Sequence, residues 1–322
     1  MTGPSFTDIE EARRRLAPLL ARTPLLHSWW LSAAASTPVH LKLESIQLTN
    51  SFKIRGAFNA LLRLVETSGA RRPTVVTASA GNHGAGIAVA AARLGVPVVV
   101  FAPRTAPTVK KDAIRRLGAT LHETTDYDAA ESEAREFARA QGACYLSPYN
   151  HPDVIAGAGT VGLEIVDALP AVTTVVVPIG GGGLASGVAI AVKGRLPHAT
   201  VIGVEAEASR AFGTSLARGE ITAIQPGRSL ADGLTGNLEP RSITFELVRR
   251  HVDRVIAVSE SELADAVRGL AAEEHLIAEG AGAASTAAVL AGRAVGRGDC
   301  AAAILSGGNI DLATFTSVVA TA

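Results

Sequence analysis

The sequence predicts an α/β fold built from parallel sheets with helices on both faces. Short apolar runs rich in valine and isoleucine alternate along the chain with alanine-rich segments long enough to form helices. These runs are continuous, which is typical of strands buried on both faces. A chain of 322 residues, 48% hydrophobic and 19% charged, can bury the large core that such a doubly wound architecture needs.

The elements follow in order along the chain. An N-terminal helix is predicted from a capping box at Thr7 and Glu10 and from apolar residues at helical spacing, beginning with Ile9. Amphipathic helices are expected at 82–95 and 260–275. The sequence contains no repeat or linker, so two domains would pack closely, with the chain crossing between them more than once. Strands are expected at 39–44, 74–79, 96–103, 173–180, 200–207, 253–259 and 301–308.

Charge and composition exclude several classes of protein. Thirty acidic residues balance thirty basic ones, so nothing favours a nucleic-acid or anionic-membrane partner. Cys144 and Cys300 lie far apart, so neither a disulfide framework nor a zinc site is expected. The N-terminus has no apolar stretch, and runs such as 96–102 are too short to cross a bilayer. We therefore expect a cytoplasmic protein with a small-molecule substrate.

Lys53 lies between two apolar residues, Phe52 and Ile54, in a chain with only five lysines among its 30 basic residues. A buried lysine amine can lose its proton and then act as a nucleophile or a base, whereas a guanidinium stays protonated. The alternative is a structural lysine whose stem lies on the core while its ammonium reaches water. Lys53 is thus a candidate catalytic residue.

The strongest local signal is GGGGLASG at 180–187, which follows a predicted buried strand and opens a predicted helix. Four glycines let the backbone approach a ligand closely and point its amides inward. The helix that begins at Leu184 adds the positive end of its dipole, so a phosphate group suits the site. The stretch matches neither a P-loop nor the dinucleotide motif, and a flexible turn is the alternative interpretation.

Two further clusters of small and polar residues follow predicted strands. In TASAGNHG (77–84), Ser79, Gly81 and Asn82 can offer donors to a carboxylate, while His83 by itself is more typical of a helix cap or a core residue. SGGN (306–309) forms the other cluster. Because ligands of open α/β sheets lie beyond the carboxyl ends of the strands, one site can receive all three clusters.

A reactive lysine, a phosphate cradle and a carboxylate-binding loop together suit pyridoxal phosphate. Its aldehyde reacts with an amine, its phosphate needs a cradle, and its ring is an electron sink for carbanion chemistry beside an amino-acid carboxylate. Spacing alone indicates a phosphate-bearing cofactor, and pyridoxal phosphate fits these groups.

The sequence resembles the fold-type II pyridoxal-phosphate enzymes, in the branch of threonine/serine dehydratases and serine racemases. The resemblance implies two doubly wound domains, as in the tryptophan synthase β fold, with the cofactor in the cleft between them. It implies a large domain of residues 1–72 and 148–322 and a small substrate-side domain of residues 73–147. The matching motifs are RTPLL (22–26), KLESIQLTNSFKIRGA (42–57), ASAGNHG (78–84), DVIAGAGTVGLEI (153–165), GGGGLASG (180–187), GVEAEAS (203–209), ADG (231–233), EGAGA (279–283) and SGGN (306–309).

The resemblance also implies a role for each matching residue. Lys53 would form a Schiff base with the cofactor and then remove the Cα proton of the substrate. Ser306 would face the ring nitrogen, and because a hydroxyl does not enforce a protonated ring, the weaker electron sink suits elimination. Phe52 would pack near the ring, Asn82 would bond its 3′ oxygen, and Gly180, Gly181, Gly182, Gly183 and the Leu184 amide would hold the phosphate. Ser79, Ala80, Gly81, Asn82 and His83 would bind the substrate carboxylate, with Asp232 bordering the substrate.

The implied activity is a pyridoxal-phosphate dependent dehydratase, or ammonia-lyase, that converts a 3-hydroxy amino acid of the threonine or serine type, or a relative, into a 2-oxo acid and ammonia. An amino-acid racemase is an alternative, but racemases place an acid/base serine where this chain has Ala80. A β-replacement synthase is another, and Lys53-Ile54-Arg55-Gly56 is evidence against it. A non-catalytic phosphate- or nucleotide-binding protein, with a structural Lys53, is the alternative of another class.

Some positions depart from the family pattern. Asn50, Ala158 and Gly280 replace a usual glycine, glutamine and proline, and GLTGNLEP (233–240) is atypical, which leaves the substrate side chain open. The divalent-cation site of some relatives pairs a glutamate with an aspartate six residues later. Glu205 matches the first residue but Ala211 occupies the second position, so we expect the cation site to be absent or weakened. Relatives are often dimers, and a homodimer is expected.

Overall fold

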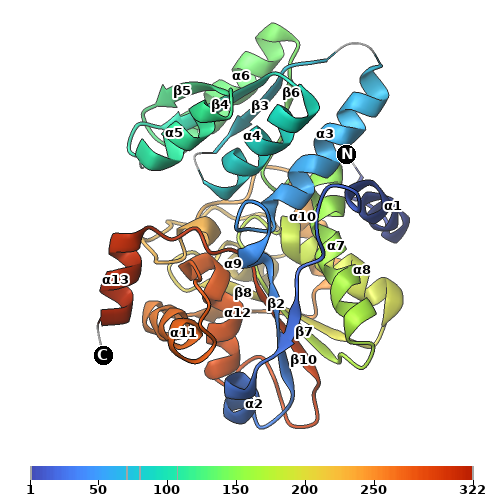
Figure 1. Cartoon of the computed structure of the whole chain (residues 1–322), viewed down its shortest axis with the longest axis vertical. Helices are drawn as coiled ribbons and strands as arrows, with labels where there is room; N and C mark the ends of the chain where they lie inside the picture. Colours follow the sequence, from blue (N-terminus) through green and yellow to red (C-terminus); the bar gives the residue numbers. More distant parts are fainter. Residues whose placement is uncertain (1, 70–71, 80, 107, 321–322) are drawn as a thin grey trace.

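The computed structural model describes residues 2–69, 72–79, 81–106 and 108–320, and it contains two separate sheets (Figure 1). A six-stranded sheet has the order β1-β2-β10-β7-β8-β9, and a four-stranded sheet has the order β5-β4-β3-β6. The strands are β1 (Leu25–His27), β2 (Val39–Leu43), β3 (Val75–Ala78), β4 (Val98–Pro103), β5 (Thr120–Thr124), β6 (Cys144–Tyr145), β7 (Thr174–Pro178), β8 (Thr200–Ala206), β9 (Arg254–Val258) and β10 (Ala301–Leu305).

Thirteen α-helices surround the sheets in the described part of the chain. They are α1 (Phe6–Leu16), α2 (Trp29–Ala35), α3 (Lys53–Ser68), α4 (Asn82–Leu94), α5 (Thr108–Arg116), α6 (Tyr127–Gln141), α7 (Pro152–Ala168), α8 (Gly183–Arg195), α9 (Ala211–Arg218), α10 (Ile243–His251), α11 (Glu260–Glu273), α12 (Gly280–Leu290) and α13 (Leu312–Ala320). Two short 3₁₀ helices, η1 (Glu44–Ile46) and η2 (Asp232–Leu234), complete the secondary structure. None of the described helices is long and apolar enough to cross a membrane.

The larger sheet is parallel except for the edge pair β1 and β2, and it is covered on both faces. Along β7, Val176 contributes to a core that includes residues of α11 and α12, while its neighbours Val175 and Val177 contribute to a core that includes residues of α7 and α8. Because successive side chains point to opposite faces, a strand buried on both sides must be apolar throughout. The predicted doubly wound architecture is confirmed.

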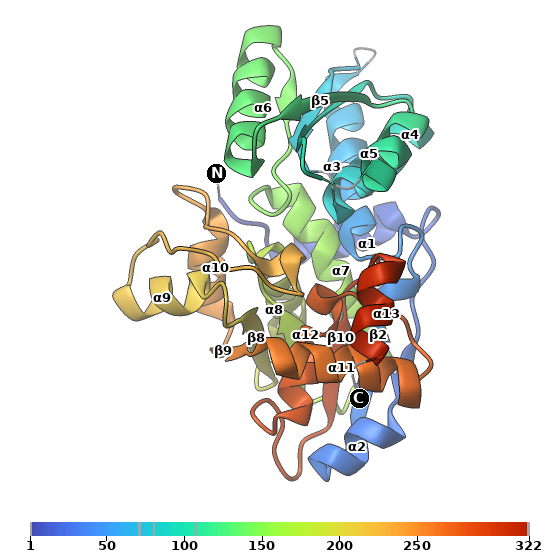
Figure 2. The ribbon, with the colours of Figure 1, turned by 90° about the vertical axis from the view of Figure 1, so that its left-hand side faces the viewer.

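The smaller sheet is wholly parallel and is also enclosed by helices (Figure 2). Residues of α3 and α4 share one core with Val75 and Val100, and residues of α6 share the other core with Val76 and Phe101. Helix α3 therefore packs beside the smaller sheet, while its first residues lie next to the larger one. The domain boundaries at 72/73 and 147/148 stay a prediction.

All seven predicted strands are present, but three strands escaped the sequence analysis. Strand β1 has three residues, β6 has two, and β5 is a polar edge strand whose sequence is TLHET. The predicted N-terminal capping box was wrong: the N-cap of α1 is Ser5, whose side chain exchanges hydrogen bonds with Asp8. Aspartate can replace glutamate in this reciprocal arrangement because only an acceptor at the third helical position is needed.

Candidate active site

Lys53 is the first residue of α3, and its position is fixed by contacts between that helix start and the end of β10. Ser51 forms an antiparallel bridge with Gly307, and the Phe52 amide donates to the Ser306 carbonyl over 3.1 Å. The lysine segment and the predicted polar cluster at 306–309 are therefore joined directly. The residues that follow each strand meet at one edge, as expected for the carboxyl ends of parallel strands.

Lys53 is half-buried, and its amine contacts two neighbouring residues. Its Nζ donates to the Pro148 carbonyl over 3.0 Å and lies 5.1 Å from the centroid of the Phe52 ring. Burial lowers the pKa of Lys53 to about 8, an effect that the nearby Glu279 carboxylate partly opposes. Burial disfavours a charged amine, so an appreciable share of Lys53 is neutral near pH 7 and available as a nucleophile or base.

The glycine loop at 180–183 follows β7 and runs into α8, as predicted. Gly182 has a φ of +85°, which favours glycine, and a Cβ there would lie 2.5 Å from the Phe212 ring. A Cβ at Gly180 would lie 2.9 Å from the Leu234 Cα, and one at Gly181 would overlap the Tyr149 ring. Side chains are thus excluded along the loop, which leaves its backbone amides to face a ligand at the start of α8.

Pro148 and Tyr149 connect the lysine to the glycine loop. The Pro148 carbonyl accepts a hydrogen bond from Lys53, and the next residue, Tyr149, packs its ring against Gly181. The lysine and the loop are therefore neighbours around one short segment. This arrangement fits pyridoxal phosphate, since an amine and a backbone phosphate cradle must be close to bind the two ends of one small molecule.

Asn82, at the start of α4, is bonded to residues from two other elements. Its Nδ2 donates to Glu279 Oε1 over 2.6 Å, and its Oδ1 accepts from Asn309 Nδ2 over 2.7 Å. Burial raises the pKa of Glu279 to about 7, against the opposing effect of the Asn82 hydrogen bond, and the Asp232 carboxylate raises it further. The chain Glu279–Asn82–Asn309 thus links α12, α4 and the segment after β10.

The predicted carboxylate-binding loop is only partly described, because Ala80 lies outside the described residues. Ser79 is buried, and its Oγ accepts from the Gly81 amide over 3.2 Å. His83 is buried, and neither ring nitrogen has a hydrogen-bond partner among the described residues. Burial, together with the nearby Lys53 charge, lowers the pKa of His83 to about 3, so the ring is neutral at pH 7.

Ser306 and Asp232 occupy different surroundings. Ser306 is buried, and among the described residues its hydroxyl reaches only the Ala281 carbonyl, at 3.5 Å, so it can still bond a ligand. Asp232 is exposed on η2 and lies close enough to Glu279 to raise that residue's pKa. Glu279 was given no role by the sequence analysis, although the motif EGAGA contains it. The sequence feature that could have identified Glu279 is an acidic residue directly before a glycine- and alanine-rich helix.

Glu205, the residue that matches a cation ligand in some relatives, binds the start of α9 instead. Its carboxylate accepts from the Phe212 amide over 2.6 Å and from the Gly213 amide over 2.9 Å. Burial raises its pKa to about 7. No group of three or more potential metal-ligating side chains occurs in the described segments, and the weakened cation site stays a prediction.

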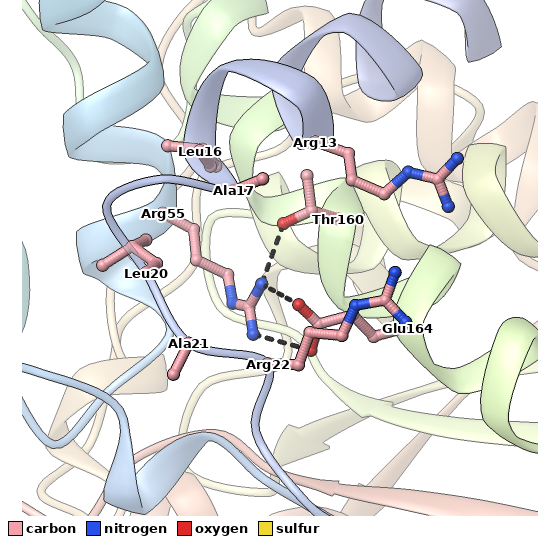
Figure 3. Close-up of a pocket in the computed structure, with 9 residues that line it drawn as sticks. All are labelled: Arg13, Leu16, Ala17, Leu20, Ala21, Arg22, Arg55, Thr160 and Glu164. Atoms are coloured by element: carbon pink, nitrogen blue, oxygen red, sulfur yellow. Dashed lines mark hydrogen bonds and ion pairs between the residues drawn. The ribbon is translucent and has the colours of Figure 1, made fainter.

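A buried ion network surrounds Arg55 in the first turn of α3, and Figure 3 shows the bonds of Arg55 to Thr160 and Glu164. Arg55, two residues after Lys53, donates from Nε to Glu44 over 2.8 Å and from Nη1 to Glu164 over 2.7 Å. Lys42 donates to the same Glu164 over 2.6 Å, and Arg55 also reaches Thr160 at 3.1 Å. Two buried cations therefore balance two buried carboxylates, and the network ties the start of α3 to α7 and to the end of β2.

Comparison with known proteins places this geometry in context. The family model described as "Pyridoxal-phosphate dependent enzyme" matches residues 16–307. The chain is 44% identical over 316 residues to an L-threonine ammonia-lyase of Thermotoga maritima, covering 98% of this chain and 78% of the relative. It is 38% identical over 320 residues to a catabolic L-threonine dehydratase of Staphylococcus aureus, covering 98% of this chain and 92% of the relative.

Solved structures resemble the whole fold. Maize serine racemase matches with a TM-score of 0.90 at 31% identity, over 98% of this chain and 96% of that one. A threonine deaminase from T.th. matches with a TM-score of 0.87 at 37% identity, over 96% of this chain and 99% of that one. Both a racemase and a deaminase thus share this architecture.

Proposed function

Because this chain belongs to the family of pyridoxal-phosphate dependent enzymes, we propose that Lys53 and the groups around it act on threonine, serine or a closely related 3-hydroxy amino acid. The protein is a pyridoxal-phosphate dependent lyase that removes water from a hydroxy amino acid, giving a 2-oxo acid and ammonia. The proposed site is supported by one observation: Pro148 and Tyr149 connect the Lys53 amine to the glycine loop. Burial also lowers the pKa of this amine to about 8.

When bound, pyridoxal phosphate supplies an electron sink for the negative charge that develops at the substrate Cα. The amides of Gly180 to Gly183 and Leu184, at the positive end of the α8 dipole, hold its phosphate. Lys53 would hold the aldehyde end of the cofactor, Asn82 would donate to its 3′ oxygen, and Ser306 would face its ring nitrogen. This assignment is supported by the exclusion of side chains along the glycine loop and by the weakly bonded Ser306 hydroxyl.

Lys53 also takes the Cα proton. A neutral amine is required for this step, and a pKa of about 8 keeps a useful fraction neutral near pH 7 while the conjugate acid can still return a proton. The donors at residues 79–83 hold the substrate carboxylate and so orient the Cα–H bond toward Nζ. The buried His83 ring is neutral, so it adds no positive charge that would lower the proton affinity of the Lys53 amine.

The first test replaces the lysine. Lys53→Ala should lower the rate of 2-oxo acid and ammonia release from threonine and serine by about a thousandfold or more, because both the nucleophile and the base are lost. Borohydride reduction of cofactor-loaded wild-type protein should mark Lys53 in a peptide mass map. Lys193→Ala, which removes a surface lysine paired with Asp253, is the matched control. A folded and fully active Lys53→Ala variant would overturn the assignment.

We further propose that the protein is a homodimer. Six of the exposed large apolar side chains lie on β1, α2, η1 and α13, just after η1, and between α11 and α12, and we call this set the apolar surface: Leu26, Trp29, Ile46, Leu48, Ile277 and Leu312. The sequence from Thr23 to Leu41 contains no acidic residue, lysine or arginine. Apolar side chains together with few charges are typical of an interface core, and a second copy offers the same uncharged chemistry.

A further inference from the structure

The segment that covers Lys53 and the glycine loop is held by one carboxylate from a distant loop. We call residues 147–150, Ser147-Pro148-Tyr149-Asn150, the strap. Its middle carries the two contacts described above, from Pro148 to the Lys53 amine and from Tyr149 to the glycine loop. Both of its ends, Ser147 and Asn150, are bonded to Glu239.

Glu239 belongs to the atypical stretch GLTGNLEP and is buried. Its Oε1 accepts a short hydrogen bond from the Ser147 hydroxyl, and its Oε2 accepts from Asn150 Nδ2 over 2.7 Å. Its backbone amide donates to the Tyr149 hydroxyl over 2.8 Å. One residue thus fastens the strap at three points, on both sides of Pro148.

Charge balance for this buried carboxylate comes from the helix on the outer face of the smaller sheet. Arg135, on α6, lies 2.6 Å from Glu239 Oε2, and it also pairs with Glu131 at 2.8 Å and stacks on the Tyr145 ring at 4.3 Å. A buried carboxylate without such partners would be strongly disfavoured. The Arg135–Glu239 pair therefore joins the smaller-sheet unit to a loop of the larger one at the level of the strap.

Burial beside Glu239 raises the pKa of Tyr149, so its phenol stays neutral. A neutral ring packed on Gly181 adds no negative charge next to a bound phosphate.

We propose that Glu239 is a positioning residue that holds the strap in place, so that Pro148 fixes the Lys53 amine and Tyr149 shapes the phosphate cradle. The inference deepens the proposed function, on which it rests. Glu239 touches neither reacting atoms nor cofactor in this scheme and acts only through residues 147–150. Its loss should therefore alter the environment of Lys53 and the retention of the cofactor, beyond any change in turnover.

The test compares Glu239→Gln with the wild type. The glutamine offers one acceptor where the strap needs two, and it removes the charge that pairs with Arg135. Cofactor-free protein is acylated with acetic anhydride across a pH series, and the Lys53 peptide is quantified by mass spectrometry. The wild-type midpoint is expected near 8, and the variant midpoint should move upward because a loosened strap lets water reach the amine.

The dissociation constant of pyridoxal phosphate should rise about tenfold in the same variant, the effect of one lost hydrogen bond to a charged group. Ser147→Ala, which removes one of the three fastening points, should move both readouts in the same direction by less. Glu10→Gln is the control, since Glu10 pairs with Arg195 at the end of α8 opposite the glycine loop.

Unchanged midpoint and cofactor affinity in folded Glu239→Gln and Ser147→Ala would overturn the inference. Neither readout requires turnover, so this failure is distinct from failure of the proposed function. Cofactor attachment to a lysine other than Lys53 in the wild type would refute the proposed function instead.

Discussion

Lys53 is half-buried and Glu279 is buried, and the pKa values of these two groups are shifted toward each other. Burial lowers the pKa of Lys53 to about 8 and raises that of Glu279 to about 7, because each charged form is poorly solvated. Each also stabilises the charge of the other. Near neutral pH, moving a proton between these two groups therefore changes the free energy little. A group that must both take and return a proton during catalysis needs such a pKa close to the working pH.

Removing the Glu279 charge should make Lys53 lose its proton more easily. In Glu279→Gln the remaining influence on Lys53 is burial, so its pKa should fall below about 8. Because only the neutral amine is acylated, labelling of Lys53 in cofactor-free protein should reach its half-maximal rate at a lower pH than in the wild type. A pH series of peptide-mapped acetylation measures this midpoint. An unchanged or raised midpoint would show that Glu279 exerts no charge effect on Lys53.

Position 80 offers a test of reaction choice that depends on sequence alone. Alanine cannot carry a proton, whereas related racemases place an acid/base serine there, so Ala80→Ser should raise racemisation relative to elimination. Chiral analysis of serine, alongside a 2-oxo acid assay, gives the product ratio. If the ratio is the same in both proteins, residue 80 does not face the substrate.

At the scale of elements, helix α3 connects the packed core to the site and so fixes the position of Lys53. Its first turn carries Lys53 toward the ligand and Arg55 into the ion network, so a shift of the helix moves both. A planar guanidinium can bond two carboxylates at once, while an ammonium cannot reproduce that fork. The network is almost completely buried, and a broken pair there leaves uncompensated charge.

Arg55→Met should therefore lower the free energy of unfolding by about 3 kcal/mol or more, the range found when one partner of a buried ion pair is lost. Arg63→Met is the matched control on the same helix, because its pair with Asp153 is partly exposed and 3.6 Å long, and it should cost less than about 1 kcal/mol. Urea unfolding followed by circular dichroism measures both. Equal decreases in the free energy of unfolding for the two variants would mean that the buried network stabilises the protein no more than a partly exposed ion pair does.

The elements that sequence analysis located are those with a strong physical signal. Continuous apolar strands such as 174–178 can only be buried in such a sheet, and glycines 180–183 mark a close approach whatever the ligand. The polar edge strand β5 carries no such signal, since pairing and not composition defines it. Glu239 and Arg135 are 104 positions apart in sequence. Only the folded chain shows that they meet over the strap.

At the scale of the whole molecule, the two sheets bring the site together from both units. Lys53, the glycine loop and Ser306 adjoin the larger sheet, whereas Ser79, Asn82 and His83 come from the smaller one (Figure 1). The apolar surface is connected to this site through the chain itself. Ile46 and Leu48 belong to it, and the following residues support the site, since the Thr49 carbonyl accepts from Asn309 and the Asn50 carbonyl accepts from the Gly308 amide.

Dimerisation should therefore support cofactor binding as well as cover apolar area. Trp29 is 81% exposed, so Trp29→Glu costs little in the single chain but places a charge in the proposed interface. Light scattering after size-exclusion chromatography should give a dimer mass for the wild type and a monomer mass for the variant, and the monomer should lose pyridoxal phosphate faster on dilution. Ala140→Glu, which adds the same charge on the exposed side of α6, should stay dimeric. A monomeric wild type would contradict the proposed dimer. A Trp29→Glu protein that stays dimeric even when combined with Leu26→Glu would show that the interface lies elsewhere. In either case the loop at 46–50 would be supported by its own chain alone.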